Sequence, residues 1–101
     1  MRLDNKVAIV TGAGRGIGEE IVYRFIENGA KVTLCDVDEP ALEAVKSKVD
    51  KMNGECLLAT GDITDRDFVG KMVDDTIAAF GTLNVMVNNA AITRDAILHK
   101  M

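Results

Sequence analysis

The chain has 101 residues, of which 48% are hydrophobic and 28% are charged. This length and composition suit one small globular domain, and they exclude a repeat array or a low-complexity chain. Sixteen acidic residues against twelve basic ones leave a net charge of −4, which argues against binding to nucleic acid phosphates. We find no apolar secretion signal at the start and no apolar run long enough to span a membrane, so we expect a cytoplasmic protein without membrane attachment.

The first predicted strand leads directly into a glycine-rich turn. Residues 6–10 form a short apolar segment that is rich in β-branched side chains, as in a buried parallel strand. Residues 11–18 follow and contain four glycines, and apolar residues then recur at helical spacing up to Gly29, which ends the helix. The turn therefore opens a helix, and the amides and dipole at a helix N-terminus attract a pyrophosphate.

The glycines follow the spacing G-x-x-x-G-x-G through Gly12, Gly16 and Gly18, and they do not fit the pattern G-x-G-x-x-G. Glycine removes the Cβ where backbone approaches a phosphate and where a helix packs closely on a strand. A glycine turn alone is equally an ordinary strand-to-helix connection. Here the flanking strand and helix, and the acidic residue after the next strand, favour a phosphate-binding turn.

That acidic residue, Asp36, follows the second predicted strand at 31–35, where its carboxylate would meet the ribose hydroxyls of a bound dinucleotide. It favours NAD over NADP, because a 2′-phosphate beside it would be repelled. Arg15 is the counter-evidence, since it would contact a 2′-phosphate if Asp36 turned away. We rank Asp36 higher and interpret Arg15 as a solvated loop charge. Asp38 and Glu39 are better placed than Asp36 to cap the next helix.

The remaining elements continue the alternation of strand and helix. We predict a helix at 40–52, a strand at 56–60, a helix from a capping box at Thr64 and Asp67 to Gly81, and a strand at 83–88. The order indicates an α/β fold, a Rossmann-like doubly wound parallel sheet with strand order 3-2-1-4. Two helices should cover one face and the third the other, leaving the outer edge of the fourth strand and part of the sheet bare.

Three motifs resemble those of the short-chain dehydrogenase/reductase family, and the resemblance extends over the whole chain. Residues 11–18 resemble its Thr-Gly-x-x-x-Gly-x-Gly cofactor motif. Asp62 resembles its acidic residue near the adenine ring, and residues 88–91 resemble its Asn-Asn-Ala-Gly segment, from which Ala91 departs. Within the family, residues 91–98 are most similar to bacterial 3-oxoacyl-acyl-carrier-protein reductases of fatty acid biosynthesis.

The resemblance implies that residues 1–101 are a partial NAD(P)-binding Rossmann domain, the N-terminal half of an oxidoreductase that reduces a carbonyl, such as a 3-oxoacyl thioester, by hydride transfer. NAD is the expected cofactor, with NADP as the alternative. The implied cofactor-binding residues are Gly12, Arg15, Gly16, Ile17 and Gly18 for the pyrophosphate, Asp36 for the adenosine ribose, Asp62 and Ile63 for the adenine, and Asn88 to Ala90 for the inner ribose.

The family's catalytic Ser and Tyr-x-x-x-Lys lie beyond its fourth strand, and these 101 residues do not supply them. Tyr23 has Glu27 four residues on, and Ser47 belongs to a polar helix face. We therefore predict no catalytic residue, and a chain inactive by itself. The alternatives are a non-catalytic nucleotide-binding module or a truncated product without function. We expect the chain to associate with itself or with a C-terminal half.

The cysteines and the histidine do not predict a metal site. Cys35 and Cys56 occupy predicted strands and are expected to be buried thiols. Because those strands should be neighbours, a disulfide is geometrically conceivable, although a reducing compartment argues against it. We expect His99 to be a surface residue.

Overall fold

The computed structural model describes residues 2–89, and within them strands and helices alternate as the sequence predicts. The elements are β1 (Val7–Thr11), α1 (Gly16–Glu27), β2 (Lys31–Asp36), α2 (Glu39–Lys51), β3 (Cys56–Thr60), α3 (Arg66–Phe80) and β4 (Val85–Val87). The strands form one parallel sheet in the order β3-β2-β1-β4. The predicted fold class and strand order are therefore confirmed.

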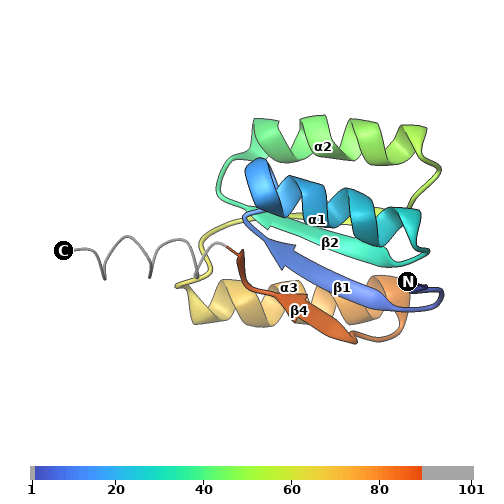
Figure 1. The fold of residues 1–101 in the computed structure, drawn as a ribbon. Helices are drawn as coiled ribbons and strands as arrows, with labels where there is room; N and C mark the ends of the chain where they lie inside the picture. The colour runs from blue at the N-terminus through green and yellow to red at the C-terminus, as the bar shows by residue number, and fades with distance from the viewer. Residues whose placement is uncertain (1, 90–101) are drawn as a thin grey trace.

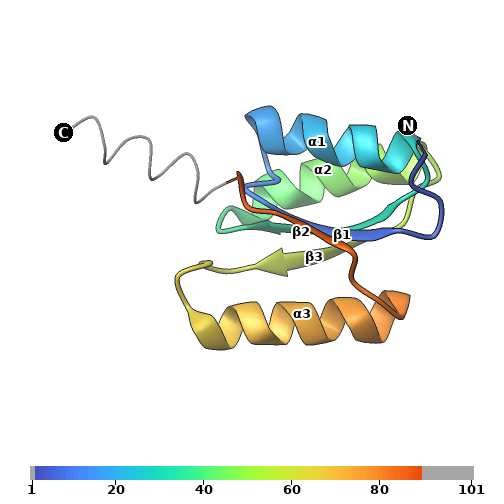
Figure 2. The same ribbon diagram turned by 60° about the horizontal axis from the view of Figure 1, so that its bottom comes forward.

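The sheet lies between two unequal helical layers. Helices α1 and α2 cover one face, and α3 covers the other face alone (Figures 1 and 2). The larger core lies under α1 and α2 and is built from side chains such as Val10, Val22, Leu34, Leu42 and Val45. The smaller core lies under α3 around Ile9, Cys35 and Met72. This asymmetry follows from the crossover pattern, which sends two connections to one side and one to the other.

Strand β4 lies at one edge of the sheet, and its apolar side chains are partly exposed, as the sequence predicts. Val85 is 37% and Met86 45% exposed, and Ile77 on the neighbouring α3 is 44% exposed. The strand is shorter than the predicted 83–88. At its start the Asn84 side chain takes part in the pairing, since Asn84 Oδ1 accepts a hydrogen bond from Val7 N at 2.8 Å.

The start of α3 differs from the predicted capping box. Asp65 is the N-cap, and its side chain accepts hydrogen bonds from Asp67 N at 3.0 Å and Phe68 N at 3.3 Å. The Thr64 hydroxyl donates instead to Asp62 Oδ1 at 2.8 Å. The prediction at Thr64 is wrong by one residue, because the neighbouring Asp carries an equally good capping oxygen and lies in register with the first free amides.

The two cysteines do not face one another. The register pairs Cys35 with Ala59 and Val32 with Cys56, so the cysteines lie three residues apart along the sheet. Cys35 packs under α3, whereas Cys56 packs against the core under α1 and α2. Both are free thiols, Cys35 buried and Cys56 half-buried. A disulfide between them is therefore ruled out, because the register places the two side chains on opposite faces of the sheet, and the preferred expectation of free thiols is confirmed.

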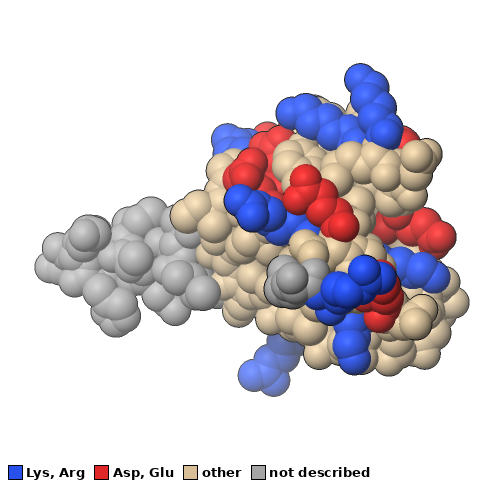
Figure 3. All heavy atoms as spheres, turned by 45° about the vertical axis from the view of Figure 1, so that its right-hand side comes forward, with Lys and Arg blue, Asp and Glu red and all other residues tan. Residues whose placement is uncertain are grey.

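Charged side chains of both signs are interspersed over the face drawn in Figure 3, in keeping with the modest net charge.

Within residues 2–89, none of the helices combines the length and the apolar character needed to cross a bilayer. His99 lies outside the described residues.

Candidate functional site

The carboxyl ends of the strands bring the predicted site residues to one edge of the sheet, on the left of Figure 1. The glycine turn follows β1 and is tied to β2, because Ala13 N donates a hydrogen bond to Cys35 O at 3.0 Å. The chain order reverses between β1 and β4, so the turn lies at the switch point of the sheet. In open α/β sheets this is where ligands bind.

Glycine is needed at two positions of the turn, for a different structural reason at each. Gly18 is buried in the first turn of α1, and a Cβ there would lie 2.0 Å from Gly12 O. The helix thus packs directly on the backbone that leaves β1. Gly16 has a φ of +62°, which side chains strain to adopt, yet no atom lies within 4 Å of the position of its Cβ. The space beside Gly16 is therefore open, as a phosphate at the start of α1 requires.

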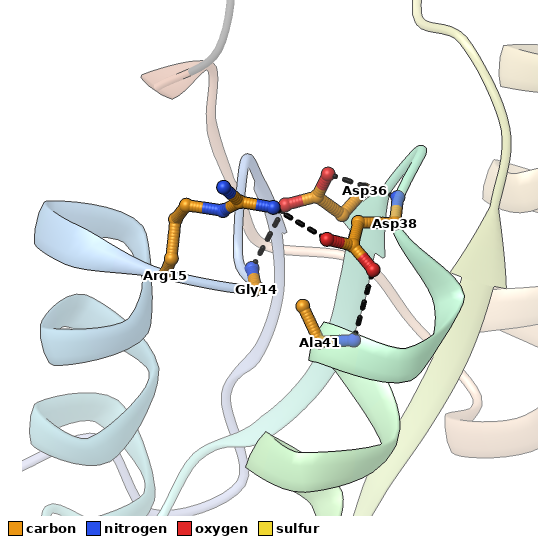
Figure 4. A network of polar contacts seen from close by, with 5 residues as sticks. All are labelled: Gly14, Arg15, Asp36, Asp38 and Ala41. Carbon is orange, nitrogen blue, oxygen red and sulfur yellow. Dashed lines mark hydrogen bonds and ion pairs between the residues drawn. The ribbon is translucent and has the colours of Figure 1, made fainter.

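The Asp36 carboxylate is held in place by two backbone amides (Figure 4). Its Oδ2 accepts a hydrogen bond from Gly14 N at 3.0 Å, and its Oδ1 accepts one from Asp38 N at 3.2 Å. The side chain is half-buried. An ionised carboxylate offers about four acceptor sites. The two amides therefore use two of these acceptor sites, and they fix the orientation of the carboxylate.

Arg15 projects from the same turn and forms an ion pair with Asp38 at the start of α2 (Figure 4). The Arg15 side chain is 73% exposed, which agrees with the predicted solvated position, but it is paired rather than free. Asp38 also caps α2, since its Oδ1 accepts a hydrogen bond from Ala41 N at 3.1 Å. The sequence predicted a capping role for Asp38 but not its ion pair with Arg15.

A cavity of about 90 Å³ opens between the ends of β1, β2 and β3. Asp62 and Ile63 lie in its wall beside Asp36, and the other lining residues are Gly12, Cys35, Val37 and Gly61. The Asp62 side chain is held by the backbone and hydroxyl of Thr64. Sequence reasoning missed Cys35 and Val37 as lining residues, although their places on either side of Asp36 were a usable signal.

The Cys35 thiol at this cavity is not expected to react as a nucleophile. Burial, together with the charges of Asp36 and Asp62, raises its pKa to about 11. It therefore remains protonated at neutral pH and contributes a small apolar surface rather than a nucleophile.

The end of β4 contributes Asn88, whose Oδ1 accepts a hydrogen bond from the Thr11 hydroxyl at 3.2 Å. This contact links the ends of β1 and β4 next to the glycine turn. Asn89 lies against the first turn of α1, since its Nδ2 would be 3.1 Å from a Cβ at Gly18. Ile17 is 72% exposed at the mouth of the turn. The predicted Ala90 lies outside the described residues.

Neither Tyr23 nor Ser47 lies in this site. Tyr23 donates a hydrogen bond to Glu19 Oε2 at 2.6 Å, and burial followed by this hydrogen bond raises the pKa of Tyr23 well above its ordinary value. The phenol therefore retains its proton. Ser47 is exposed on α2. Among residues 2–89, no three His, Cys, Asp or Glu side chains are grouped to hold a metal ion.

Comparison with known proteins places the chain in a family. The family model described as "short chain dehydrogenase" matches residues 6–101. The chain belongs to the short chain dehydrogenase family. The 3-oxoacyl-acyl-carrier-protein reductase FabG of Thermotoga maritima is 36% identical over 101 residues, which are 100% of this chain and 41% of that protein. FabG of Chlamydia muridarum is 42% identical over 98% of this chain and 40% of its own length.

Other members of the family are similarly close. Zerumbone synthase of Zingiber zerumbet is 42% identical over 97% of this chain and 36% of its own length. Among solved structures, a family member from Burkholderia phymatum in complex with NAD has a TM-score of 0.81 at 30% identity, covering 85% of this chain and 31% of that one. A 7α-hydroxysteroid dehydrogenase complexed with NADH and 7-oxo glycochenodeoxycholic acid has a TM-score of 0.83 at 36% identity, covering 86% and 34%. The chain thus spans about two fifths or less of the length of these relatives.

Proposed function

We propose that this chain binds a nicotinamide dinucleotide, with NAD preferred over NADP, at the carboxyl ends of its strands. The observation that carries the proposal is the Asp36 carboxylate, which two backbone amides orient beside the glycine turn and the cavity. The hydroxyls of a ribose there would donate hydrogen bonds to the Asp36 carboxylate, whereas a 2′-phosphate would meet a like charge. The NAD and NADH complexes of the two structural relatives support the cofactor class.

The remaining residues fit the other parts of such a cofactor. The close packing of Gly18 on Gly12 leaves no space for a Cβ and brings the N-terminus of α1 against the turn, where its amides would hold the pyrophosphate. The cavity beside Asp62 and Ile63 would take the adenine edge. Asn88 would lie near the inner ribose, and so, from the family resemblance, would Ala90. When bound, the reduced cofactor supplies the hydride.

We further propose that residues 1–101 act as a partial Rossmann domain of an oxidoreductase that reduces a 3-oxoacyl thioester-like carbonyl. Similarity to two FabG proteins supports this substrate class. The residues of this chain would bind and orient the cofactor, and proton transfer to the carbonyl would need groups outside them. Tyr23 is unsuited to that task, because burial, and after it the hydrogen bond to Glu19, raise the pKa of Tyr23 rather than lowering it. The cytoplasmic location stays a prediction.

The test is calorimetric titration of the chain with NAD and with NADP, before and after Asp36→Ala. Hydrogen bonds to a charged acceptor contribute about 1.5–3 kcal/mol, so NAD affinity should fall about 10- to 100-fold. The gap between NAD and NADP should narrow. Asp74→Ala removes the same charge from the exposed face of α3 and is the matched control. A folded chain that binds neither cofactor, or one that already prefers NADP, would contradict the proposal.

A further inference from the structure

The ion pair between Arg15 and Asp38 connects two elements at the proposed ribose site. Arg15 leaves the glycine turn just before α1, and Asp38 begins α2 (Figure 4). The same two segments are joined a second time by Asp36, which accepts hydrogen bonds from Gly14 N and Asp38 N. The Arg15 guanidinium is therefore paired with a residue whose amide also holds the Asp36 carboxylate, at the point where the adenosine ribose is expected.

Asp38 is the rigid member of this pair. Its Oδ1 is engaged by Ala41 N as the helix cap, and its own amide donates to Asp36. Its other oxygen, Oδ2, faces Arg15. Only 34% of the Asp38 side chain is exposed, against 73% for Arg15. The position of the long Arg15 side chain is thus determined by a carboxylate that the start of α2 holds in place.

We propose that Asp38 is a positioning residue for cofactor choice, because it holds Arg15 as its partner and keeps that guanidinium from binding a 2′-phosphate. The inference rests on the proposed cofactor site and extends it to a residue outside the family motifs quoted above. Arg15 is the counter-charge that NADP would need, since a guanidinium binds phosphate bidentately. With Asp38 in place, a 2′-phosphate would have to break the pair and also face a second negative charge.

The size of the effect follows from the exposure of the pair. Exposed ion pairs are weak, so releasing Arg15 is worth about two- to five-fold in affinity. Removing the Asp38 charge near a phosphate dianion adds a further factor of similar order. The two factors multiply, so we expect Asp38→Asn to raise the affinity for a 2′-phosphate ligand, relative to its unphosphorylated counterpart, by about 4- to 25-fold.

Asparagine is the informative replacement because it keeps the helix cap. Its side-chain oxygen would still accept from Ala41 N, which turns its NH₂ group toward Arg15 and ends the attraction. Asp38→Ser also retains a capping oxygen and provides a second variant if Asn disturbs α2. Glu39→Gln is the matched control, because it removes the same charge from the same exposed turn.

The experiment is calorimetry at low salt with adenosine 2′,5′-bisphosphate and AMP as probes, after circular dichroism has shown that each variant is folded. We expect Asp38→Asn and Asp38→Ser to raise the bisphosphate-to-AMP affinity ratio well above the ratio in Glu39→Gln. In an Arg15→Ala background the gain should shrink to the factor that comes from the Asp38 charge alone, about two- to five-fold. An equal gain in Glu39→Gln, or a gain that is as large without Arg15 as with it, would overturn the inference while AMP binding upholds the proposed site. Absence of AMP binding in the folded original chain would overturn both.

Discussion

Replacing Gly18 with alanine tests whether α1 packs on the glycine turn as closely as the structure shows. The added Cβ would lie 2.0 Å from Gly12 O and 2.7 Å from Gly12 C, both backbone atoms that no rotamer change can move. Relief requires the turn and the helix to separate by about 1 Å or more. Overpacking of a close-packed site costs about 1–3 kcal/mol, and a backbone clash belongs at the upper end. The gain in helix propensity offsets about 1 kcal/mol, so the free energy of unfolding should fall by about 2 kcal/mol.

Gly70→Ala is the matched control, because the same substitution is made inside a helix with no neighbour to clash. Gly70 lies in α3, is exposed, and has no atom within 4 Å of the position of its Cβ. Only the propensity gain and the reduced freedom of the unfolded chain remain. We expect the free energy of unfolding to rise by about 0.5–1 kcal/mol.

Urea unfolding followed by circular dichroism measures both variants, and the two midpoints should move in opposite directions from the original chain. If Gly18→Ala is as stable as the original, or gains stability like Gly70→Ala, then the helix does not lie against Gly12 and the account of the turn is wrong. An unchanged slope with denaturant would show that the shifts reflect stability rather than altered compactness.

Three further outcomes are expected. Gly16→Val should leave most of the fold intact but weaken NADH binding, because valine strains the backbone at a φ of +62° and projects into the space expected for the pyrophosphate; unchanged affinity in a folded variant would remove Gly16 from the site. The hydrogen bond from Tyr23 lowers the pKa of Glu19 below its usual 4.5, so its stabilisation is present above that pH and is lost as the pH falls through the lowered value. Tyr23→Phe should thus cost about 0.5–1 kcal/mol at pH 7 and progressively less below pH 4.5 in urea titrations, and a pH-independent difference would contradict this. Residues 1–101 should bind NAD yet show no NADH oxidation with a 3-oxoacyl thioester, and saturable turnover abolished by Asp36→Ala would refute the assignment of chemistry to groups elsewhere.

The sequence alone determined the order and kind of the elements and the place of the glycine turn. Residues 6–10 and 31–35 are apolar runs bounded by turns, and this local pattern is sufficient to predict buried parallel strands. The handedness of the crossovers then determined the strand order without any knowledge of contacts. Asp36 was predictable for the same reason, since a residue that ends a parallel strand must lie at the carboxyl edge of the sheet.

Only the tertiary structure decided the contacts between elements distant in the chain. The faces of Cys35 and Cys56 depend on the register of β2 and β3, and a shift by one residue would reverse either of them. The pair of Arg15 with Asp38 joins residues 23 apart, and no local pattern relates the two. Thr64 and Asp65 are both capping residues, and the backbone conformation of the turn decides that Asp65 is the N-cap of α3. The local periodicity of the sequence specifies which segments form strands and helices. Which charged groups pair, and which face of the sheet a side chain occupies, depend on how those strands and helices pack together in space.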